Sequence, residues 1–146
     1  DIGSSFIPSE LNAAFLYAQL QSMDDAYLSR SKIWDFYKIN LENNKNFSIP
    51  KSFIKNAHNS HIFPLITSSL KERTELLNFL NKKQIKAVFH YVPLHTSEGG
   101  KKYGKNADDL SVTNDLADRI LRLPIYSNME MQDAERVVTS VLEFYA

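Results

Sequence analysis

Several features that identify common protein classes are absent from this sequence of 146 residues. It contains no cysteine, which excludes disulfides, thiolate nucleophiles, iron–sulfur clusters and zinc ribbons. Its 17 basic side chains balance 17 acidic ones, so it lacks the basic excess that nucleic-acid and membrane-surface binding require. No apolar run approaches the roughly 18 residues that span a bilayer. We therefore expect no nucleic-acid partner and no membrane partner.

Aromatic side chains, in contrast, are abundant. They make up 12% of the chain, with nine phenylalanines and seven tyrosines, and a small domain this rich in rings uses some of them on a partner surface or a ligand site. The chain opens at Asp1 without an initiator Met and without a basic region followed by an apolar one. We expect no signal peptide and interpret this start as the cut end of a longer protein.

The first segment has the pattern of two helices, from Pro8 to about Leu41 with a break near Met23, Asp24 and Asp25. Apolar residues lie on almost every face of the first helix: Leu11, Ala13, Ala14, Phe15, Leu16, Tyr17, Ala18 and Leu20. A helix that is apolar all round is buried on several sides, which one small domain does not achieve alone. We therefore predict that residues 1–44 are a helical connector that lies at a dimer or domain interface.

Residues 45–146 are predicted to form a small α+β domain. Strand-forming residues predict strands at His61–Ile66, Ile85–Tyr91 and Leu121–Ile125, the first at a sheet edge because it contains Pro64. Helices are predicted after the capping box of Ser69 and Glu72, over Ser111–Leu121 and over Asp133–Tyr145, with a loop over Ser97–Asp109. The fold class is therefore α+β, a long helical entry segment followed by a roughly three-stranded sheet with helices on one face.

The four histidines are the first candidates for chemistry: His58, His61, His90 and His95. A metal site is one interpretation of these pairs, but neither pair has a carboxylate near it in the sequence, and hydrogen-bonded loop histidines are the simpler interpretation for His58. The stretch from His90 to His95 places imidazoles, a phenol and a proline where a strand ends. It is compatible with a site for a polar ligand and equally with a turn whose rings only pack.

Other catalytic patterns are weaker or missing. Gly3, Ser4 and Ser5 precede a helix, where backbone N–H groups can bind an anion, although a serine there is more often a cap. The lysines lie in polar surroundings typical of solvated charge, and no P-loop, dinucleotide motif or nucleophile–base pair occurs. The residues themselves thus predict an α+β domain with one polar-ligand edge.

Four motifs in order resemble the C-terminal part of the DegT/StrS-type sugar-nucleotide aminotransferases, which have the aspartate-aminotransferase fold. These are Gly3-Ser4-Ser5-Phe6-Ile7-Pro8-Ser9-Glu10-Leu11, His61-Ile62-Phe63, Ala87-Val88-Phe89-His90-Tyr91-Val92-Pro93-Leu94-His95 and Leu121-Arg122-Leu123-Pro124-Ile125. The second, third and fourth resemble that family's HxF, HYxPLH and LPL elements. The resemblance covers essentially the whole chain and implies the small domain of a fold-type I pyridoxal 5′-phosphate (PLP) transferase.

The resemblance also implies an activity. Such enzymes use PLP on a lysine of a larger N-terminal domain to transfer an amino group from glutamate to the C4 ketone of a sugar such as a dTDP-4-oxo-6-deoxy-hexose. That lysine would lie upstream of Asp1, so the chain alone is expected to be inactive. The intact enzyme is expected to be a cytoplasmic homodimer joined through the first helix. The alternatives are a non-catalytic α+β module that binds a small ligand or a protein, and a histidine metal site.

The resemblance assigns site residues in two groups. Ser4 and Ser5 fall where relatives reach the cofactor phosphate across the dimer. His90, Tyr91 and His95 fall on the sugar side of the cleft, which His61 is expected to organise. No catalytic residue and no metal ligand is assigned within this chain. Pro64 and the loop at Gly99 and Gly100 depart from the family pattern, so substrate contacts there are expected to differ.

Overall fold

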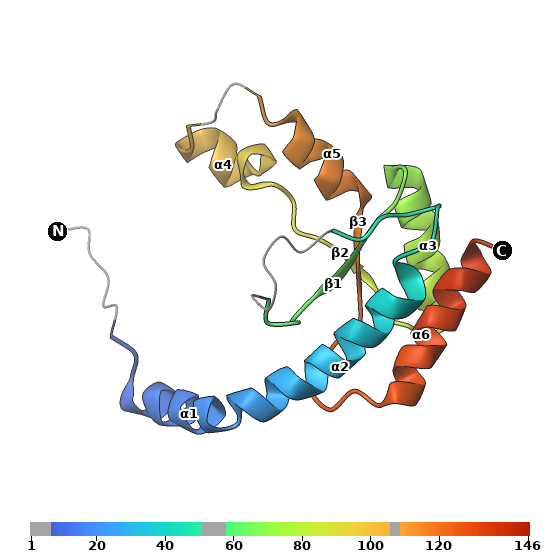
Figure 1. Ribbon diagram of the computed structural model, residues 1–146. Coiled ribbons are helices and arrows are strands. Elements are labelled where there is room, and N and C mark those ends of the chain that lie inside the picture. Colours follow the sequence, from blue (N-terminus) through green and yellow to red (C-terminus); the bar gives the residue numbers. More distant parts are fainter. Residues whose placement is uncertain (1–6, 51–57, 106–108) are drawn as a thin grey trace.

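The computed structural model of the chain describes residues 7–50, 58–105 and 109–146. In chain order its elements are α1 (Glu10–Gln21), α2 (Met23–Leu41), β1 (Phe63–Ile66), α3 (Leu70–Lys82), β2 (Val88–Phe89), the 3₁₀ turn η1 (Leu94–Thr96), α4 (Glu98–Tyr103), α5 (Ser111–Arg119), β3 (Ile120–Leu123) and α6 (Met131–Phe144). The strands form one antiparallel sheet in the order β1-β3-β2 (Figure 1). The predicted α+β class is confirmed, and β1 is an edge strand as Pro64 indicates.

The predicted break in the N-terminal helical segment lies at Ser22, between α1 and α2. Ser9 caps α1, because its side-chain oxygen accepts the backbone N–H of Asn12 at 3.3 Å. α1 buries none of its residues, whereas α2 buries Ile33, Trp34, Tyr37 and Leu41. α1 extends from the start of α2 away from the sheet (Figure 1). None of the helices within the described ranges is long and apolar enough to cross a membrane.

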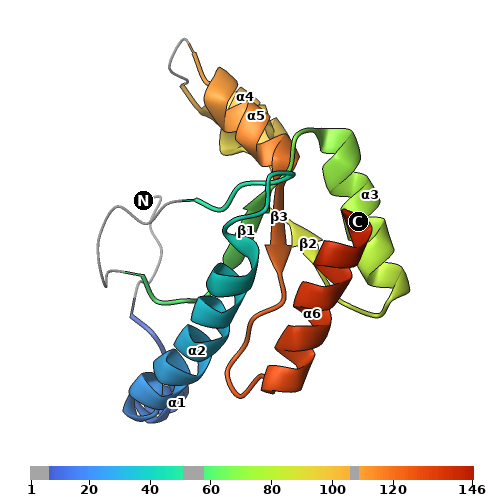
Figure 2. The same ribbon diagram turned by 45° about the vertical axis from the view of Figure 1, so that its right-hand side comes forward.

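α2, α3 and α6 pack on one face of the sheet (Figure 2). Phe63 of β1 is fully buried there, with its ring edge-on to Trp34 and Tyr37 at centroid distances of 5.4 and 5.1 Å. The apolar spacing of α6 predicts a buried face of Ala134, Val137, Val138, Val141, Leu142 and Tyr145; the first four are buried, Tyr145 is half-buried and Leu142 is 39% exposed. Leu142 lies about 100° around the helix from Val141 and about 40° beyond Val138, and therefore at the margin of the buried stripe.

The register decides which side chains lie on each face. Phe63 pairs with Leu123 and Leu65 with Leu121, and all four of these side chains are buried against the helices. Neighbouring positions along a strand alternate in direction, so Pro64, Arg122 and Val88, which pair across the three strands, share the opposite side. We call this side the second face of the sheet.

Two predicted elements differ from the structure. β2 has two residues instead of the seven of Ile85–Tyr91, because Ala87 donates its N–H to the carbonyl of Ile85 at 2.9 Å in a tight turn, which takes these groups away from β3. The segment after Ser97, predicted as a loop that could hold one helical turn, contains the six-residue helix α4, whose N-cap is Ser97. Gly100 permits that helix, since a Cβ there would lie 1.7 Å from the carbonyl oxygen of Leu94.

The division of the chain into residues 1–44 and 45–146 stays a prediction. The buried residues of α2 belong to the same core cluster as those of the sheet, α3 and α6. Tyr37 shows this most directly, because its hydroxyl donates to the carbonyl of Pro124 at 2.9 Å, just beyond β3. The second helix is thus one layer of the packed core, whereas the first is not.

Candidate functional site

The strongest candidate site lies where β2 ends. His90 and Tyr91 line a hollow of about 350 Å³ together with Arg73 of α3, Thr96 of η1 and Asn114 of α5. Tyr91 is 73% exposed and His90 is half-buried, with its ring 5.3 Å from the Tyr91 ring. The hollow therefore combines phenol, imidazole, guanidinium, hydroxyl and amide groups, which suit a ligand rich in oxygen atoms.

His95 does not line this hollow itself but contacts Asn114, which does. Its Nε2 lies 2.9 Å from Oδ1 of Asn114, so it donates to the amide oxygen and is held against α5. Thr96 is fixed by its own backbone, because both its N–H and its hydroxyl donate to the carbonyl of Pro93, at 3.0 and 2.9 Å. The structure therefore brings together His90, Tyr91 and His95, with one histidine half-buried beside the sheet and the other tied to a helix.

Two arginines of the site are missing from the candidates that the sequence provides. Arg73 donates through Nε to the carbonyl of Asp118 at 3.0 Å, and its guanidinium carbon lies 5.3 Å from the centre of the Phe89 ring. Arg122 lies 5.4 Å from the centre of the Tyr91 ring, and its Nη2 donates to the carbonyl of Phe89 at 3.4 Å. A single arginine on a helix or a strand resembles solvated surface charge in a sequence, so no pattern singles these residues out.

The electrostatic setting of His90 is unusual for a residue beside a strand end. Burial lowers its pKa from the ordinary value of histidine, and the nearby charges of Arg122 and His61 lower it further. The charged form is disfavoured by desolvation and by like charge alike. His90 is therefore a neutral imidazole near pH 7, able to donate one hydrogen bond and accept another.

His61 and His58 lie at a second hollow of about 230 Å³, which is also lined by Trp34 and Pro64. The ring of His58 lies 4.2 Å from that of Trp34, and its Nδ1 accepts the backbone N–H of Ser60 at 3.3 Å. These contacts agree with the simpler interpretation of His58 as a hydrogen-bonded loop histidine. His61 instead hydrogen-bonds through Nδ1 to the side chain of Asn59, and its ring is exposed.

A metal centre finds no support in the described part of the chain. Within residues 7–50, 58–105 and 109–146, no group of three or more His, Asp or Glu side chains is arranged to hold a metal ion. His61 and His90 line different hollows, and His58 and His95 have the separate partners given above. The four histidines are therefore divided among different local roles.

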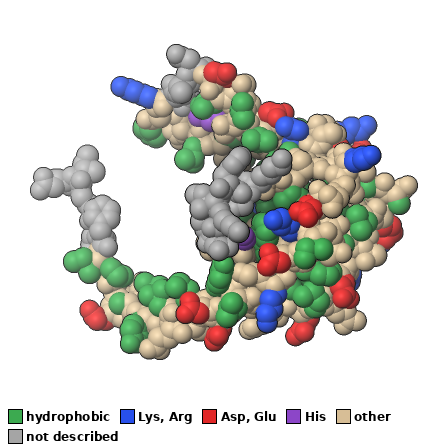
Figure 3. All heavy atoms as spheres, in the orientation of Figure 1, with side chains coloured by type: hydrophobic (Ala, Val, Ile, Leu, Met, Phe, Trp, Pro, Cys, Tyr) green, Lys and Arg blue, Asp and Glu red, His purple; other side chains and the backbone are tan. Residues whose placement is uncertain are grey.

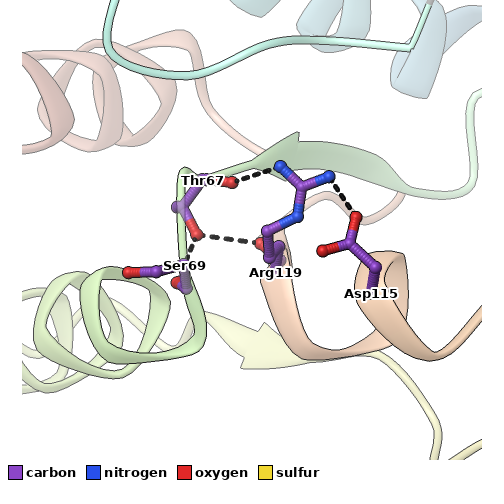
Figure 4. A network of polar contacts seen from close by, with 4 residues as sticks. All are labelled: Thr67, Ser69, Asp115 and Arg119. Atoms are coloured by element: carbon purple, nitrogen blue, oxygen red, sulfur yellow. Dashed lines mark hydrogen bonds and ion pairs between the residues drawn. The ribbon is translucent and has the colours of Figure 1, made fainter. Parts of the chain in front are cut away.

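A polar network holds α5, and with it Asn114, against the sheet (Figure 4). Arg119 donates through Nη1 to the carbonyl of Thr67 at 3.2 Å and pairs through Nη2 with Asp115. The buried hydroxyl of Thr67 lies 3.0 Å from the carbonyl of Ser69 and 3.1 Å from that of Arg119. The junctions β1–α3 and α5–β3 are thereby tied to each other on one side of the hollow.

The candidate cofactor residues Ser4 and Ser5 lie outside the described residues. The helix that follows them presents its apolar side chains to solvent, with Leu16, Tyr17 and Leu20 exposed by 54%, 67% and 53%. Figure 3 shows hydrophobic side chains gathered over α1. A helix meant for an interface leaves its apolar side chains uncovered in a single chain, as α1 does here.

A family model described as the DegT/DnrJ/EryC1/StrS aminotransferase family matches residues 2–142. GDP-perosamine synthase of Escherichia coli O157:H7 is 28% identical over 146 residues, which cover 99% of this chain and 38% of the relative. The dTDP-4-amino-4,6-dideoxy-D-glucose transaminase of Shigella dysenteriae is 27% identical over 144 residues, with 97% and 39% covered. The chain thus spans somewhat more than a third of the length of these curated relatives.

Among solved structures, the chain is similar to Helicobacter pylori PseC, an aminotransferase involved in the biosynthesis of pseudoaminic acid. The TM-score is 0.84 at 21% sequence identity, and the likeness covers 99% of this chain and 39% of that one. At this identity the likeness shows the fold alone, and it agrees with the predicted small α+β domain.

Proposed function

The chain belongs to the DegT/DnrJ/EryC1/StrS aminotransferase family, and on this premise we propose that it is the C-terminal part of a sugar-nucleotide transaminase. The intact enzyme transfers an amino group from glutamate to the C4 ketone of a dTDP-4-oxo-6-deoxy-hexose. We propose dTDP-4-oxo-6-deoxy-D-glucose as the substrate and dTDP-4-amino-4,6-dideoxygalactose, a precursor of polysaccharides, as the product. A relative named as a dTDP-4-amino-4,6-dideoxy-D-glucose transaminase supports this class of substrate.

One observation carries the proposal for this chain, namely the polar hollow at the end of β2. His90 and Tyr91 line it from the strand and Asn114, which holds His95, lines it from α5. A sugar nucleotide offers hydroxyl and phosphate oxygens, which imidazole, phenol and guanidinium groups bind with directed hydrogen bonds. We propose that these residues bind and orient the substrate, and that His61 supports the same cleft from the β1 side.

We propose PLP as the cofactor, since it supplies the electron sink that exchange of an amino group requires. None of the described residues that line the two hollows is a lysine, so they do not fit covalent attachment of PLP. We place the attachment lysine in the larger N-terminal part of the enzyme. Ser4 and Ser5 are proposed to donate hydrogen bonds to the cofactor phosphate of the neighbouring subunit.

We propose a homodimer joined through α1. Phe15 is 70% exposed and Leu11 is 84% exposed on this helix, and burying one such side chain contributes about 1.5–3 kcal/mol. In the intact enzyme, Phe15→Lys is expected to shift sedimentation from dimer to monomer, because a charge cannot be buried there without a partner. Ile39→Lys, at a 70% exposed position of α2, is the matched control and is expected to leave the dimer unchanged. A Phe15→Lys protein that sediments as a dimer contradicts the proposed interface.

The proposed location is the cytoplasm. Both proposed substrates are charged, and the cost of taking charged groups into an apolar phase keeps them in the compartment where they are made. A fusion of the intact protein to a fluorescent reporter tests this, with diffuse signal inside the cell as the expected result.

The test of the activity uses the protein encoded by the complete reading frame that contains this chain. Incubated with PLP, glutamate and dTDP-4-oxo-6-deoxy-D-glucose, it is expected to form an amino sugar nucleotide that mass spectrometry detects. The coupling constants of the sugar H4 proton in NMR spectra then distinguish the galacto from the gluco configuration. The 146-residue chain with the same additions is expected to form no product.

Two outcomes would overturn this assignment. Product formed by the 146-residue chain alone would contradict the proposed division of the enzyme. An intact protein that aminates neither the dTDP-linked sugar nor the corresponding GDP-linked sugar, and that shows no PLP absorbance, would instead favour a non-catalytic binding module.

A further inference from the structure

Asn114 of α5 and Thr96 of η1 lie on neighbouring parts of the wall of the hollow at the end of β2. Both side chains line it. They are linked through His95, which precedes Thr96 in the chain and whose Nε2 lies 2.9 Å from Oδ1 of Asn114. Their hydrogen-bonding groups therefore decide together which chemical group this part of the wall can receive.

The amide of Asn114 is oriented by His95. An amide oxygen can only accept a hydrogen bond, so the imidazole N–H donates to it and occupies Oδ1. The nitrogen at the other side of the same planar amide, Nδ2, carries two N–H donors. Because Asn114 is exposed, these donors are accessible to a ligand in the hollow. Towards such a ligand, Asn114 is a donor.

Thr96 has the opposite character. Its hydroxyl oxygen lies 2.9 Å from the carbonyl oxygen of Pro93. A carbonyl can only accept, so the hydroxyl donates its single hydrogen there and keeps lone pairs for a ligand. Thr96 is therefore an acceptor, and the wall of the hollow offers a donor beside an acceptor.

A donor beside an acceptor selects a hydroxyl group. The oxygens of a ketone, a carboxylate or an ionised phosphate only accept, so their lone pairs would face those of Thr96, and an ammonium group only donates. A hydroxyl group both accepts and donates through one oxygen. The apolar side chains of Val92, Pro93 and Ala117 also line the hollow, and they suit the C–H groups of a sugar ring.

We propose that Asn114 and Thr96 recognise one ring hydroxyl of the hexose, at C2 or C3, and that His95 is a positioning residue that fixes the amide of Asn114. The inference rests on the proposed function and makes it more specific. It adds Asn114 and Thr96 as determinants of sugar specificity, and it separates the residues that contact the sugar from the residue that orients one of them.

Both partners are held in place by contacts outside the hollow. α5 is tied to the end of β1, because Arg119 donates to the carbonyl of Thr67 at 3.2 Å (Figure 4). Next to η1, the hydroxyl of Ser97 donates to the carbonyl of Leu94 at 2.7 Å and accepts the N–H of Gly100 at 3.0 Å. A site whose donor and acceptor are already in position loses less conformational entropy when it binds, so a single hydroxyl can affect the affinity.

The experiment compares three unreactive ligands by isothermal titration calorimetry with the intact protein loaded with PLP. dTDP-6-deoxy-D-glucose has no ketone to aminate, and its 2-deoxy and 3-deoxy derivatives each lack one hydroxyl. The wild-type protein is expected to bind one of the two derivatives about tenfold more weakly than the parent, the size expected for lost hydrogen bonds. Asn114→Asp keeps an oxygen acceptor for His95 but removes the N–H donors, and is expected to reduce this ratio of affinities to about threefold or less.

The ratio isolates the contact with the hydroxyl, because a general effect such as the added charge of Asn114→Asp acts on parent and derivative alike. Thr96→Val is expected to reduce the ratio in the same way. His95→Leu is also expected to reduce it, whereas His95→Gln, which keeps a nitrogen donor, restores it in part. Asn78→Asp on α3 and Thr113→Val on α5, both at exposed positions, are the matched controls and are expected to leave the ratio unchanged. The Tm of each variant shows that it is folded.

Equal affinity of the wild-type protein for all three ligands overturns the hydroxyl site, as does a ratio that Asn114→Asp and Thr96→Val leave unchanged. A ratio that His95→Leu leaves unchanged overturns the positioning role. In these cases the transaminase assignment stands, because amination of the substrate is measured separately. An intact protein that binds none of the three ligands and aminates no sugar nucleotide overturns both the inference and the proposed function.

Discussion

The network that joins Thr67 to Arg119 allows a prediction whose magnitude follows from the structure. Thr67 is 1% exposed, and its hydroxyl donates to the carbonyls of Ser69 and Arg119. In Thr67→Val the side-chain volume is kept, and the carbonyl of Arg119 still receives the N–H of residue 67 at 3.1 Å. The carbonyl of Ser69 loses its hydroxyl donor, which is expected to lower the free energy of unfolding by about 1–2 kcal/mol.

The other members of the network are expected to contribute less. Arg119→Lys removes the guanidinium group that donates to the carbonyl of Thr67. We expect the free energy of unfolding to fall by about 1 kcal/mol, because the arginine is partly exposed. Asp115→Asn removes a pair between neighbouring turns of α5 in which the acidic side chain is 57% exposed. Pairs of this kind contribute only about 0.3–0.5 kcal/mol. The predicted order of the losses is therefore Thr67→Val, then Arg119→Lys, then Asp115→Asn.

The assay is urea unfolding followed by the fluorescence of Trp34, the one tryptophan of the chain, which is buried against the sheet. The loss in Thr67→Val corresponds to a decrease in Tm of roughly 3–8 °C for a chain of this length. Thr74→Val is the matched control, because its hydroxyl only adds a second donor to the carbonyl of Leu70 on an exposed turn of α3. The reasoning is refuted if Thr67→Val is no more destabilising than Thr74→Val.

Two further predictions concern the core and its pH dependence. Tyr37→Phe removes the donor to the partly buried carbonyl of Pro124 and is expected to lower the free energy of unfolding by about 1–1.5 kcal/mol, measured by urea titration; an unchanged midpoint counts against that bond. Burial raises the pKa of Glu72, but hydrogen bonds from Ser68 and Tyr145 outweigh it and lower the pKa overall. The carboxylate therefore stabilises the fold above the ordinary Glu value of about 4.3 and loses this effect as the pH falls through its lowered pKa. Glu72→Gln is expected to be less stable than the wild type near neutral pH and to approach it as the pH falls below the ordinary Glu value, and Glu75→Gln, on an exposed face of the same helix, is the matched control.

Local signals in the sequence were sufficient for most of the elements. Ser69 caps α3 as its spacing to Glu72 predicts, and Pro64 indicates the edge position that β1 occupies. These signals succeed because a cap or a proline acts on the backbone within a few residues. β2 was predicted too long, because strand propensity at Ile85 and Ala87 does not reveal the turn between them.

The candidate site was found in part for the same reason. His90, Tyr91 and His95 stand close together in the sequence, so their pattern is visible there. Arg73 and Arg122 were missed, since each is a solitary arginine whose role depends on rings and carbonyls elsewhere in the chain. His61 was singled out, but its relation to His90 could not be inferred from positions 29 residues apart in the sequence.

The sequence by itself determined the α+β class, the capped helices, the family and the polar residues that follow β2. Only the tertiary structure decided that Arg122 lies on the second face of the sheet, beside the ring of Tyr91. The physical reason is strand register, because side chains alternate across a sheet and a slip by one residue would turn Arg122 toward the helices. Burial of Leu121 and Leu123 against the core fixes that register, and thereby places the arginine on the face away from the helices.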